Sequence, residues 1–277
     1  MIRYGIAETI GFRKQMEDAH AIWDREQPGL FGAEVYDGHA GSSAAVIAAE
    51  MLTPYFINLH KITCTGSSEK HAFTAAALRE AYLATDRYIV DQGTESGTAA
   101  ATLYICEEKF IAANAGDTRI VMGNGAGFVQ LTIDHKPDLP GERARIEAAG
   151  GRVLFYDVPR VQGTLAMSRA LGDASLKPYV TAEPRVVEGS LGWTNDIAVI
   201  ACDGLWDVFT SEEAVLAARA AGNPEEAAQR LQNQAIERGS TDNITVIVLD
   251  LRSYTAACKR DSLRILGVLD RAAEGTT

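Results

Sequence analysis

The chain has 277 residues, of which 47% are hydrophobic, and its 37 acidic and 26 basic side chains give a net charge of −11. This acidic balance argues against a general nucleic-acid-binding surface, which requires a basic face. No apolar run approaches the roughly 20 residues of a transmembrane helix, and the N-terminus lacks the pattern of a signal peptide. We therefore expect a soluble protein of the cytoplasm, with the nucleus as an alternative and a monomer as the default.

Apolar runs bounded by turn residues predict a series of short strands. They cover residues 30–36, 99–106, 109–116, 118–123, 128–133, 196–202 and 244–251. Only a few residues separate consecutive runs between 99 and 133, and such short turns join antiparallel neighbours, because parallel strands need a crossover of about a dozen residues. We therefore expect each of these four strands to pair with the next.

Helical periodicity alternates with these strands. Apolar residues recur at helical spacing over 42–61 and 69–90. Thr210 and Glu213 form a capping-box pattern, and a further helix opens at 223–226 and runs to a glycine at 239. Antiparallel strands with pairs of helices predict an α+β layered domain. Residues 253–277 are expected to form a C-terminal helical tail.

The four cysteines, at positions 64, 106, 202 and 258, are far apart and form no C-x-x-C pair. We expect reduced, mostly buried thiols.

Two of the predicted strands end on an Asp-Gly pair, Asp37-Gly38 and Asp203-Gly204. Glycine allows the chain to turn sharply there, so that the aspartate can project into a cleft between layers. Other acidic residues border strands or turns as well: Glu17, Asp18, Asp117, Asp207 and Asp242. A single aspartate beside a turn is more often a cap than a ligand. Several together, with few Lys or Arg nearby to pair with them, indicate a site for a hard divalent cation such as Mg²⁺ or Mn²⁺.

Eight segments in order resemble the motifs of the metal-dependent protein phosphatases, the PPM family of type 2C serine/threonine phosphatases. They are GFRKQMEDAH, EVYDGHAG, ESGTAAATLYI, NAGDTR, LTIDHKP, GTLAMSRALGD, ACDGLWDV and STDNITVIVLDL. The resemblance implies a four-layer α-β-β-α sandwich, with two antiparallel sheets flanked by pairs of antiparallel helices. It places the catalytic domain at 1–252, with a flap at about 138–165. Phosphorylated proteins are the implied substrates.

The resemblance also implies two Mg²⁺ or Mn²⁺ ions per active site. Asp37 matches the ligand that bridges them, and Asp203 and Asp242 match the other carboxylates of the first ion. Glu17 and the carbonyl oxygen of Gly38 match ligands of the second ion. Water bound to these ions would attack the phosphate ester directly, without a covalent phosphoenzyme.

Three further residues match catalytic positions of the family. Asp18 would orient the metal-bound water, Arg13 would bind the phosphate with two parallel hydrogen bonds, and His39 would protonate the departing alkoxide. A weaker third cation site, present in many members, matches Asp117, Asp203 and Asp207. Ala40 departs from the family, which usually has glycine there.

Three alternative functions remain to be weighed. A non-catalytic family member acting as a scaffold would usually have lost an aspartate ligand or the phosphate-binding arginine, and this chain retains them all. A two-metal phosphodiesterase or nuclease would want a basic channel. A phosphopeptide-binding module would need a cluster of arginines rather than of aspartates.

Overall fold

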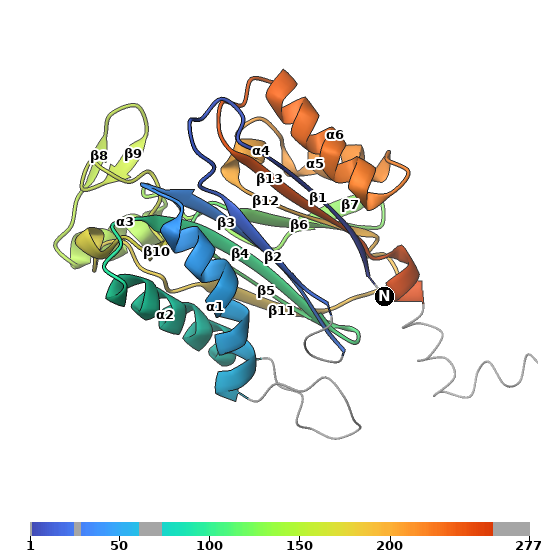
Figure 1. The fold of residues 1–277 in the computed structure, drawn as a ribbon, viewed down its shortest axis with the longest axis horizontal. Helices are drawn as coiled ribbons and strands as arrows, with labels where there is room; N and C mark the ends of the chain where they lie inside the picture. Colours follow the sequence, from blue (N-terminus) through green and yellow to red (C-terminus); the bar gives the residue numbers. More distant parts are fainter. Residues whose placement is uncertain (1, 25–28, 61–73, 257–277) are drawn as a thin grey trace, which may run out of the picture.

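The computed structural model describes residues 2–24, 29–60 and 74–256, and these form two β-sheets packed face to face with helices on both outer sides. Figure 1 shows the four layers, with one pair of helices below the lower sheet and another pair above the upper sheet. The expected α+β fold with a four-layer α-β-β-α arrangement is therefore confirmed.

All strand pairings within the two large sheets are antiparallel. The five-stranded sheet runs in the order β1 (Arg3–Thr9), β13 (Ile244–Asp250), β12 (Ile197–Ala201), β6 (Arg119–Asn124) and β7 (Gly127–Gln130). The six-stranded sheet runs in the order β11 (Arg185–Ser190), β5 (Lys109–Ala115), β4 (Gly97–Cys106), β3 (Leu30–His39) and β2 (Ala19–Trp23), and the short β10 (Leu171–Gly172) also pairs with β4.

The helices cover the outer faces of the sheets. The six-stranded sheet packs against α1 (Ser43–His60) and α2 (Ala75–Asp91), and the five-stranded sheet packs against α5 (Ser211–Arg219) and α6 (Pro224–Glu237). The shorter helices are α3 (Pro140–Ala148), which contacts β8, the 3₁₀ turn η1 (Ala174–Leu176), and α4 (Asp203–Trp206), which contacts β12, β13 and α6. The hairpin of β8 (Val153–Phe155) and β9 (Pro159–Val161) projects from one end of the sandwich, within the stretch expected to be the flap.

One expected pairing is wrong. The strands predicted at 99–106 and 109–116 do pair, as β4 and β5, and those at 118–123 and 128–133 pair as β6 and β7. The strands at 109–116 and 118–123, however, lie in different sheets, because the chain crosses from one sheet to the other at the NAGD turn. A short turn can therefore also connect two packed sheets, and this one places Asp117 between them.

The helix ends follow the capping signals. The hydroxyl of Thr210 accepts from the Glu213 amide at 3.2 Å, and the Glu213 carboxylate accepts from the Thr210 amide at 2.9 Å. Asn223 caps α6 through the Glu226 amide at 2.7 Å. Of the helix expected over 69–90, residues 69–73 lie outside the described ranges, and so do residues 257–277 of the C-terminal tail; residues 252–256 are helical.

The cysteines divide into two kinds. Cys202 is a buried free thiol, as expected. Cys106 is disulfide-bonded, so the expectation of reduced thiols is wrong for this residue. Cys64 and Cys258 lie outside the described residues.

Candidate functional site

Strand alternation aims the aspartate of β3 into the seam between the two sheets. Phe31, Ala33 and Val35 belong to the core between the sheets, whereas Tyr36 packs under the helices on the opposite face. Because successive side chains of a strand point to opposite faces, Asp37 continues the row of the inter-sheet residues. The apolar row thus ends in a carboxylate at one edge of the seam.

The Asp-Gly pair of β3 does not make the sharp turn expected from the sequence. Asp37 and Gly38 still pair with β4, and the chain turns after them, at Ala40 (φ 55°) and Gly41 (φ 115°). Gly38 is needed for another reason: a Cβ there would lie 2.2 Å from the Glu17 carbonyl oxygen. Ala40 adopts a left-handed conformation, which explains why the family usually has glycine there and costs about 1 kcal/mol or more.

The five-stranded sheet supplies the opposing side of the site. Asp203 is the first residue of α4, directly after β12, and its amide donates to Asp37 at 3.4 Å. Thr245 of β13 holds Asp18, a buried residue directly before β2 of the other sheet, because its hydroxyl donates to the Asp18 carboxylate at 2.7 Å. Cys202 lies beside these groups, with its sulfur accepting from the Thr245 amide at 3.1 Å. Carboxylates from segments far apart in sequence therefore meet at the seam.

The ammonium group of Lys136 lies beside the carboxylates of the third predicted cation site, Asp117, Asp203 and Asp207. Asp117 is buried, and one of its oxygens accepts from Lys136 Nζ at 2.5 Å. Its other oxygen is buried and has no hydrogen-bond partner among the described residues. Burial alone would lower the pKa of Lys136, but Asp117, Asp203 and Asp207 outweigh it and raise the pKa above its usual value. Lys136 is a functional candidate that the sequence reasoning missed, although the quoted motif LTIDHKP contains it.

The loop between β1 and β2 carries Arg13 and Glu17, and Asn243 anchors it. The Asn243 amide group donates to the carbonyl oxygens of residues 10 and 15 at 2.9 and 3.0 Å, and its oxygen accepts from the Glu17 amide at 2.8 Å. Arg13 contacts the carboxylate of Asp242 at 2.5 Å, and the Glu17 carboxylate accepts from the Gly41 amide at 2.8 Å. Asn243 is the second residue that sequence reasoning missed, although it follows Asp242 in the quoted motif.

His39, the last residue of β3, contacts an aspartate from a distant loop. Its Nε2 lies 2.9 Å from both carboxylate oxygens of Asp173. The same ring's Nδ1 is buried and has no partner among the described residues. Asp173 is the third missed residue, and it stands at the end of the quoted motif GTLAMSRALGD.

Burial, with mutual repulsion added to it, raises the pKa values of the carboxylates at the seam. Burial raises the pKa of Asp37 well above its usual value, and the charges of Asp203, Asp18 and Asp117 add to this effect. Burial and the neighbouring Asp117 and Asp207 do the same to the pKa of Asp203. Burial raises the pKa of Asp18 to about 6. These carboxylates would remain ionised together only beside added positive charge.

The donor set fits divalent cations. Ligand atoms of Asp37, Asp117 and Asp203 all lie within 4.8 Å of one another, and so do those of Asp18, Asp37 and Cys202. Hard cations prefer the carboxylate oxygens of these aspartates to the sulfur of Cys202, and the buried Asp117 oxygen without a partner among the described residues is one group that a cation would satisfy. Within the described residues, Glu17, Asp207 and Asp242 lie outside these two tight groups. Glu17 directly precedes Asp18 in the chain, the charge of Asp242 raises the pKa values of Asp18 and Asp37, and the Asp207 amide donates to the carbonyl oxygen of Asp203 at 2.8 Å.

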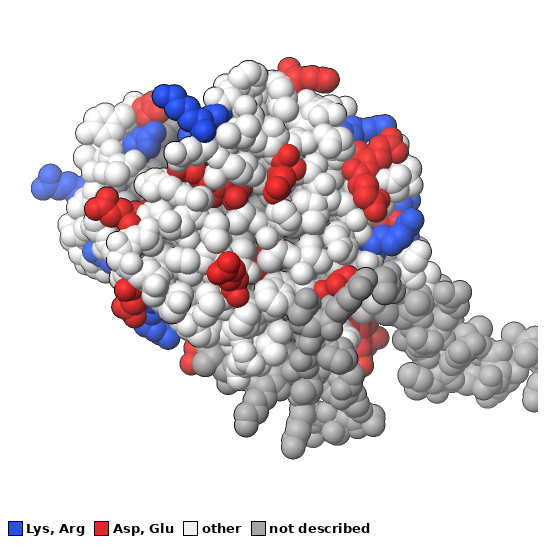
Figure 2. Space-filling view, in the orientation of Figure 1, with Lys and Arg blue, Asp and Glu red and all other residues white. Residues whose placement is uncertain are grey.

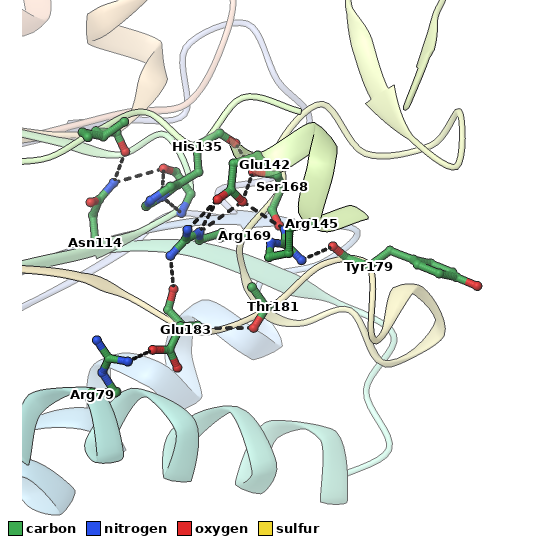
Figure 3. Close-up of polar contacts among 12 residues, drawn as sticks. Arg79, Asn114, His135, Glu142, Arg145, Ser168, Arg169, Tyr179, Thr181 and Glu183 are labelled. Atoms are coloured by element: carbon green, nitrogen blue, oxygen red, sulfur yellow. Dashed lines mark hydrogen bonds and ion pairs between the residues drawn. The ribbon is translucent and has the colours of Figure 1, made fainter. Parts of the chain in front are cut away.

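A polar network attaches α3 to the site (Figure 3). The Glu142 carboxylate accepts from Arg169 Nε at 3.1 Å, Arg145 Nη2 at 3.0 Å and the Ser168 hydroxyl at 2.8 Å. The Ser168 amide in turn donates to the carbonyl oxygen of His135 at 2.8 Å, and the Ser168 hydroxyl oxygen lies 2.9 Å from the same carbonyl oxygen. The His135 amide donates to the Gly116 carbonyl oxygen at 2.9 Å, directly beside Asp117. The base of the flap is thus hydrogen-bonded to the segment that carries a candidate ligand.

Comparisons with known proteins identify the family to which the chain is similar. The family model described as protein phosphatase 2C matches residues 2–244. The probable protein phosphatase 2C 59 of Arabidopsis thaliana is 39% identical over 254 residues, which cover 89% of this chain and 78% of the relative. A solved C. elegans sex determining protein superposes with a TM-score of 0.83 at 26% identity, covering 93% of this chain and 67% of that chain.

A second solved structure supports the fold. The serine-threonine phosphatase 2C of Toxoplasma gondii has a TM-score of 0.78 at 24% identity, covering 90% of this chain and 94% of its own. The chain therefore belongs to the protein phosphatase 2C family, whose members are metal-dependent serine/threonine phosphatases that act on phosphoproteins.

Proposed function

We propose that this chain hydrolyses phosphoserine and phosphothreonine esters in proteins in one step, with two Mg²⁺ or Mn²⁺ ions and without a covalent phosphoenzyme. The observation that carries the proposal is the convergence of Asp37, Asp117 and Asp203 within 4.8 Å, with too little positive charge beside them. A dianionic phosphate could enter such a site only when cations reverse its charge. Glu17, Gly38 and Asp242 would complete the ligands of the two ions, and Asp207 those of a third.

The ions, when bound, would acidify water and neutralise charge on the phosphoryl group. The protein groups around them have separate tasks. Arg13 is more than half exposed and would turn from Asp242 to the phosphate oxygens. Asp18 would hold the attacking water in line with the ester. As the new bond from water oxygen to phosphorus forms, the ester P–O bond breaks, and its electron pair stays on the alcohol oxygen, which takes a proton from His39.

The rival functions are less well supported. Cys202 lies beside the site, but its thiol is buried and hydrogen-bonded to the backbone groups of Asn243 and Thr245. It therefore offers no nucleophile for a covalent route. A nuclease would need a basic channel, whereas acidic side chains are spread over the face seen in Figure 2 and basic ones stand near its edges. A scaffold without activity is disfavoured because every matched ligand position keeps its acidic residue.

We further propose that residues 1–252 form the catalytic domain with the flap at about 138–165, that the protein acts as a monomer, and that it works in the cytoplasm. Among the helices of the described residues, none is long and apolar enough to cross a membrane.

The test is phosphate release from a phosphothreonine peptide with Mn²⁺ or Mg²⁺, with and without EDTA. Asp37→Asn should abolish turnover and weaken Mn²⁺ binding in calorimetry, because it removes a carboxylate shared by both groups of candidate ligands. Asp91→Asn, an exposed aspartate at the end of α2, is the matched control and should behave as wild type. A folded protein that binds Mn²⁺ without releasing phosphate would refute the proposal, and hydrolysis of bis(p-nitrophenyl) phosphate alone would favour a phosphodiesterase.

A further inference from the structure

The contact between His39 and Asp173 is more than a surface ion pair. The Asp173 side chain is only 7% exposed and that of His39 only 23%. Both carboxylate oxygens lie 2.9 Å from the same ring nitrogen, and within the described part of the chain they have no other hydrogen-bond partner. A buried carboxylate needs a partner, and the fold gives this one a single imidazole.

The surrounding chain is shaped to allow this contact. His39 pairs with Gly97 of β4, and a Cβ at Gly97 would lie 2.1 Å from the Asp173 carboxylate and 2.5 Å from His39 Nε2. Asp173 itself has φ 50°, a left-handed conformation that is unfavourable for a residue with a side chain. Backbone strain of this kind persists only where the surrounding structure enforces it.

The enforcing contacts come from α2. The Asp86 carboxylate accepts from the Gly172 amide at 2.8 Å and from Lys177 Nζ at 2.9 Å. Asp86 therefore fixes the loop on both sides of Asp173 without contacting His39. This separates two roles: Asp86 holds the loop, and Asp173 holds the imidazole.

We propose that Asp173 is the positioning residue for His39, holding the imidazole by Nε2 so that it can protonate the departing alcohol. The proposal rests on the function of His39 proposed above. Asp173 occupies Nε2, which leaves Nδ1 as the ring nitrogen without a partner among the described residues. The proposed proton transfer would run from Nδ1 to the ester oxygen as the P–O bond breaks. An aspartate that orients a catalytic imidazole is an established way to fix ring position.

The test uses two substrates that differ in their need for a proton. The alkoxide of threonine leaves poorly unless it is protonated, whereas p-nitrophenolate leaves without help. With saturating Mn²⁺, Asp173→Asn should lower kcat for a phosphothreonine peptide by about 10- to 100-fold, part of the factor that proton transfer supplies. The kcat for p-nitrophenyl phosphate should change far less, and His39→Gln should show the same selectivity.

Two further variants make the result decisive. Asp86→Asn keeps an oxygen acceptor for the Gly172 amide and removes only the charge that faces Lys177, so it should lack the selective loss on the peptide. Asp173→Gly removes the carboxylate while relieving the left-handed strain, so it tests the proposal even if Asp173→Asn folds poorly. In the His39→Gln background, Asp173→Asn should cause no further loss of peptide turnover, because both act through one proton.

Equal losses on both substrates, or the same pattern from Asp86→Asn, would show a merely structural role and overturn the inference, while the proposed phosphatase activity would stand. A wild-type protein inactive on both substrates would instead refute the proposed function, and this inference with it.

Discussion

Glu142 should stabilise the fold in a strongly pH-dependent way, and the variant Glu142→Gln tests this. Burial alone would raise the pKa of Glu142, but hydrogen bonds from Arg169, Ser168 and Arg145 and the charge of Arg169 lower it from 4.5 to about 2. A shift of this size corresponds to about 3 kcal/mol at 1.36 kcal/mol per pH unit. Glutamine keeps the shape but leaves two guanidinium groups without an anion. We therefore expect a loss of about 3 kcal/mol at pH 7, which lowers Tm by about 6–12 °C.

The sign of the pH dependence follows from the depressed pKa. The contribution of Glu142 is fully present above its unfolded pKa of 4.5 and is lost as the pH falls toward its folded pKa of about 2. At about pH 3 more than half of the difference between wild type and Glu142→Gln should therefore have disappeared. Protonation of other carboxylates affects both proteins alike and cancels in this difference.

Urea unfolding followed by tryptophan fluorescence, at pH 7 and at about pH 3, measures the two free energies of unfolding. Glu147→Gln, on the same helix but exposed, is the matched control and should change stability little at either pH. A Glu142→Gln deficit that stays constant between the two pH values, or that equals the effect of Glu147→Gln, would refute the reasoning.

Three other outcomes are expected. Asn243→Ala should lower kcat/KM for a phosphothreonine peptide by about 10- to 100-fold, because the loop with Arg13 and Glu17 loses its three anchoring hydrogen bonds; unchanged kinetics would contradict this. Lys136→Gln should tighten Mn²⁺ binding in calorimetry by about tenfold by removing a competing positive charge from Asp117, whereas weaker binding would argue against competition. Mn²⁺ at about 100 times its Kd should add about 2.7 kcal/mol to the free energy of unfolding, and EDTA should reverse this increase. A Tm that changes neither with Mn²⁺ nor with EDTA would contradict a buried cation site.

The sequence predicted the interior of the fold better than its edges. Runs of buried residues gave β3, β4, β5, β12 and β13, in which nearly every position is enclosed. The short strands β8, β9 and β10 were not predicted, and neither were β1, β2 and β11, each of which lies at the edge of one of the two large sheets. All five residues of β2 are half-buried, so the strand shows neither an apolar run nor a clear alternation. An edge strand forms because the neighbouring strand offers hydrogen bonds to its backbone. The residues of the edge strand itself do not show that such a neighbour is present.

The same limit applies to the site. The acidic residues could be singled out because each borders a strand or turn, and the order of the motifs gave each a proposed role. Asn243, Lys136 and Asp173 were missed because their importance lies in contacts with residues distant along the chain. Asn243 anchors residues 226 to 233 positions away, and Asp173 meets His39 across 134 positions. Such contacts depend on how the two sheets pack, which the spacing of motifs does not specify.

The location of the site follows from how the sandwich is built. Two sheets packed face to face fill their seam with alternate residues, and apolar side chains occupy it as far as Val35 on β3 and Cys202 after β12. At the end of the seam the same alternation places Asp37 opposite Asp203, while the NAGD crossing between the sheets contributes Asp117. Carboxylates placed in this way repel one another across the seam, so a cation between them would link the two sheets. Binding and folding are therefore coupled at this end of the sandwich, where a rigid core supports the ligands and solvent can still reach them.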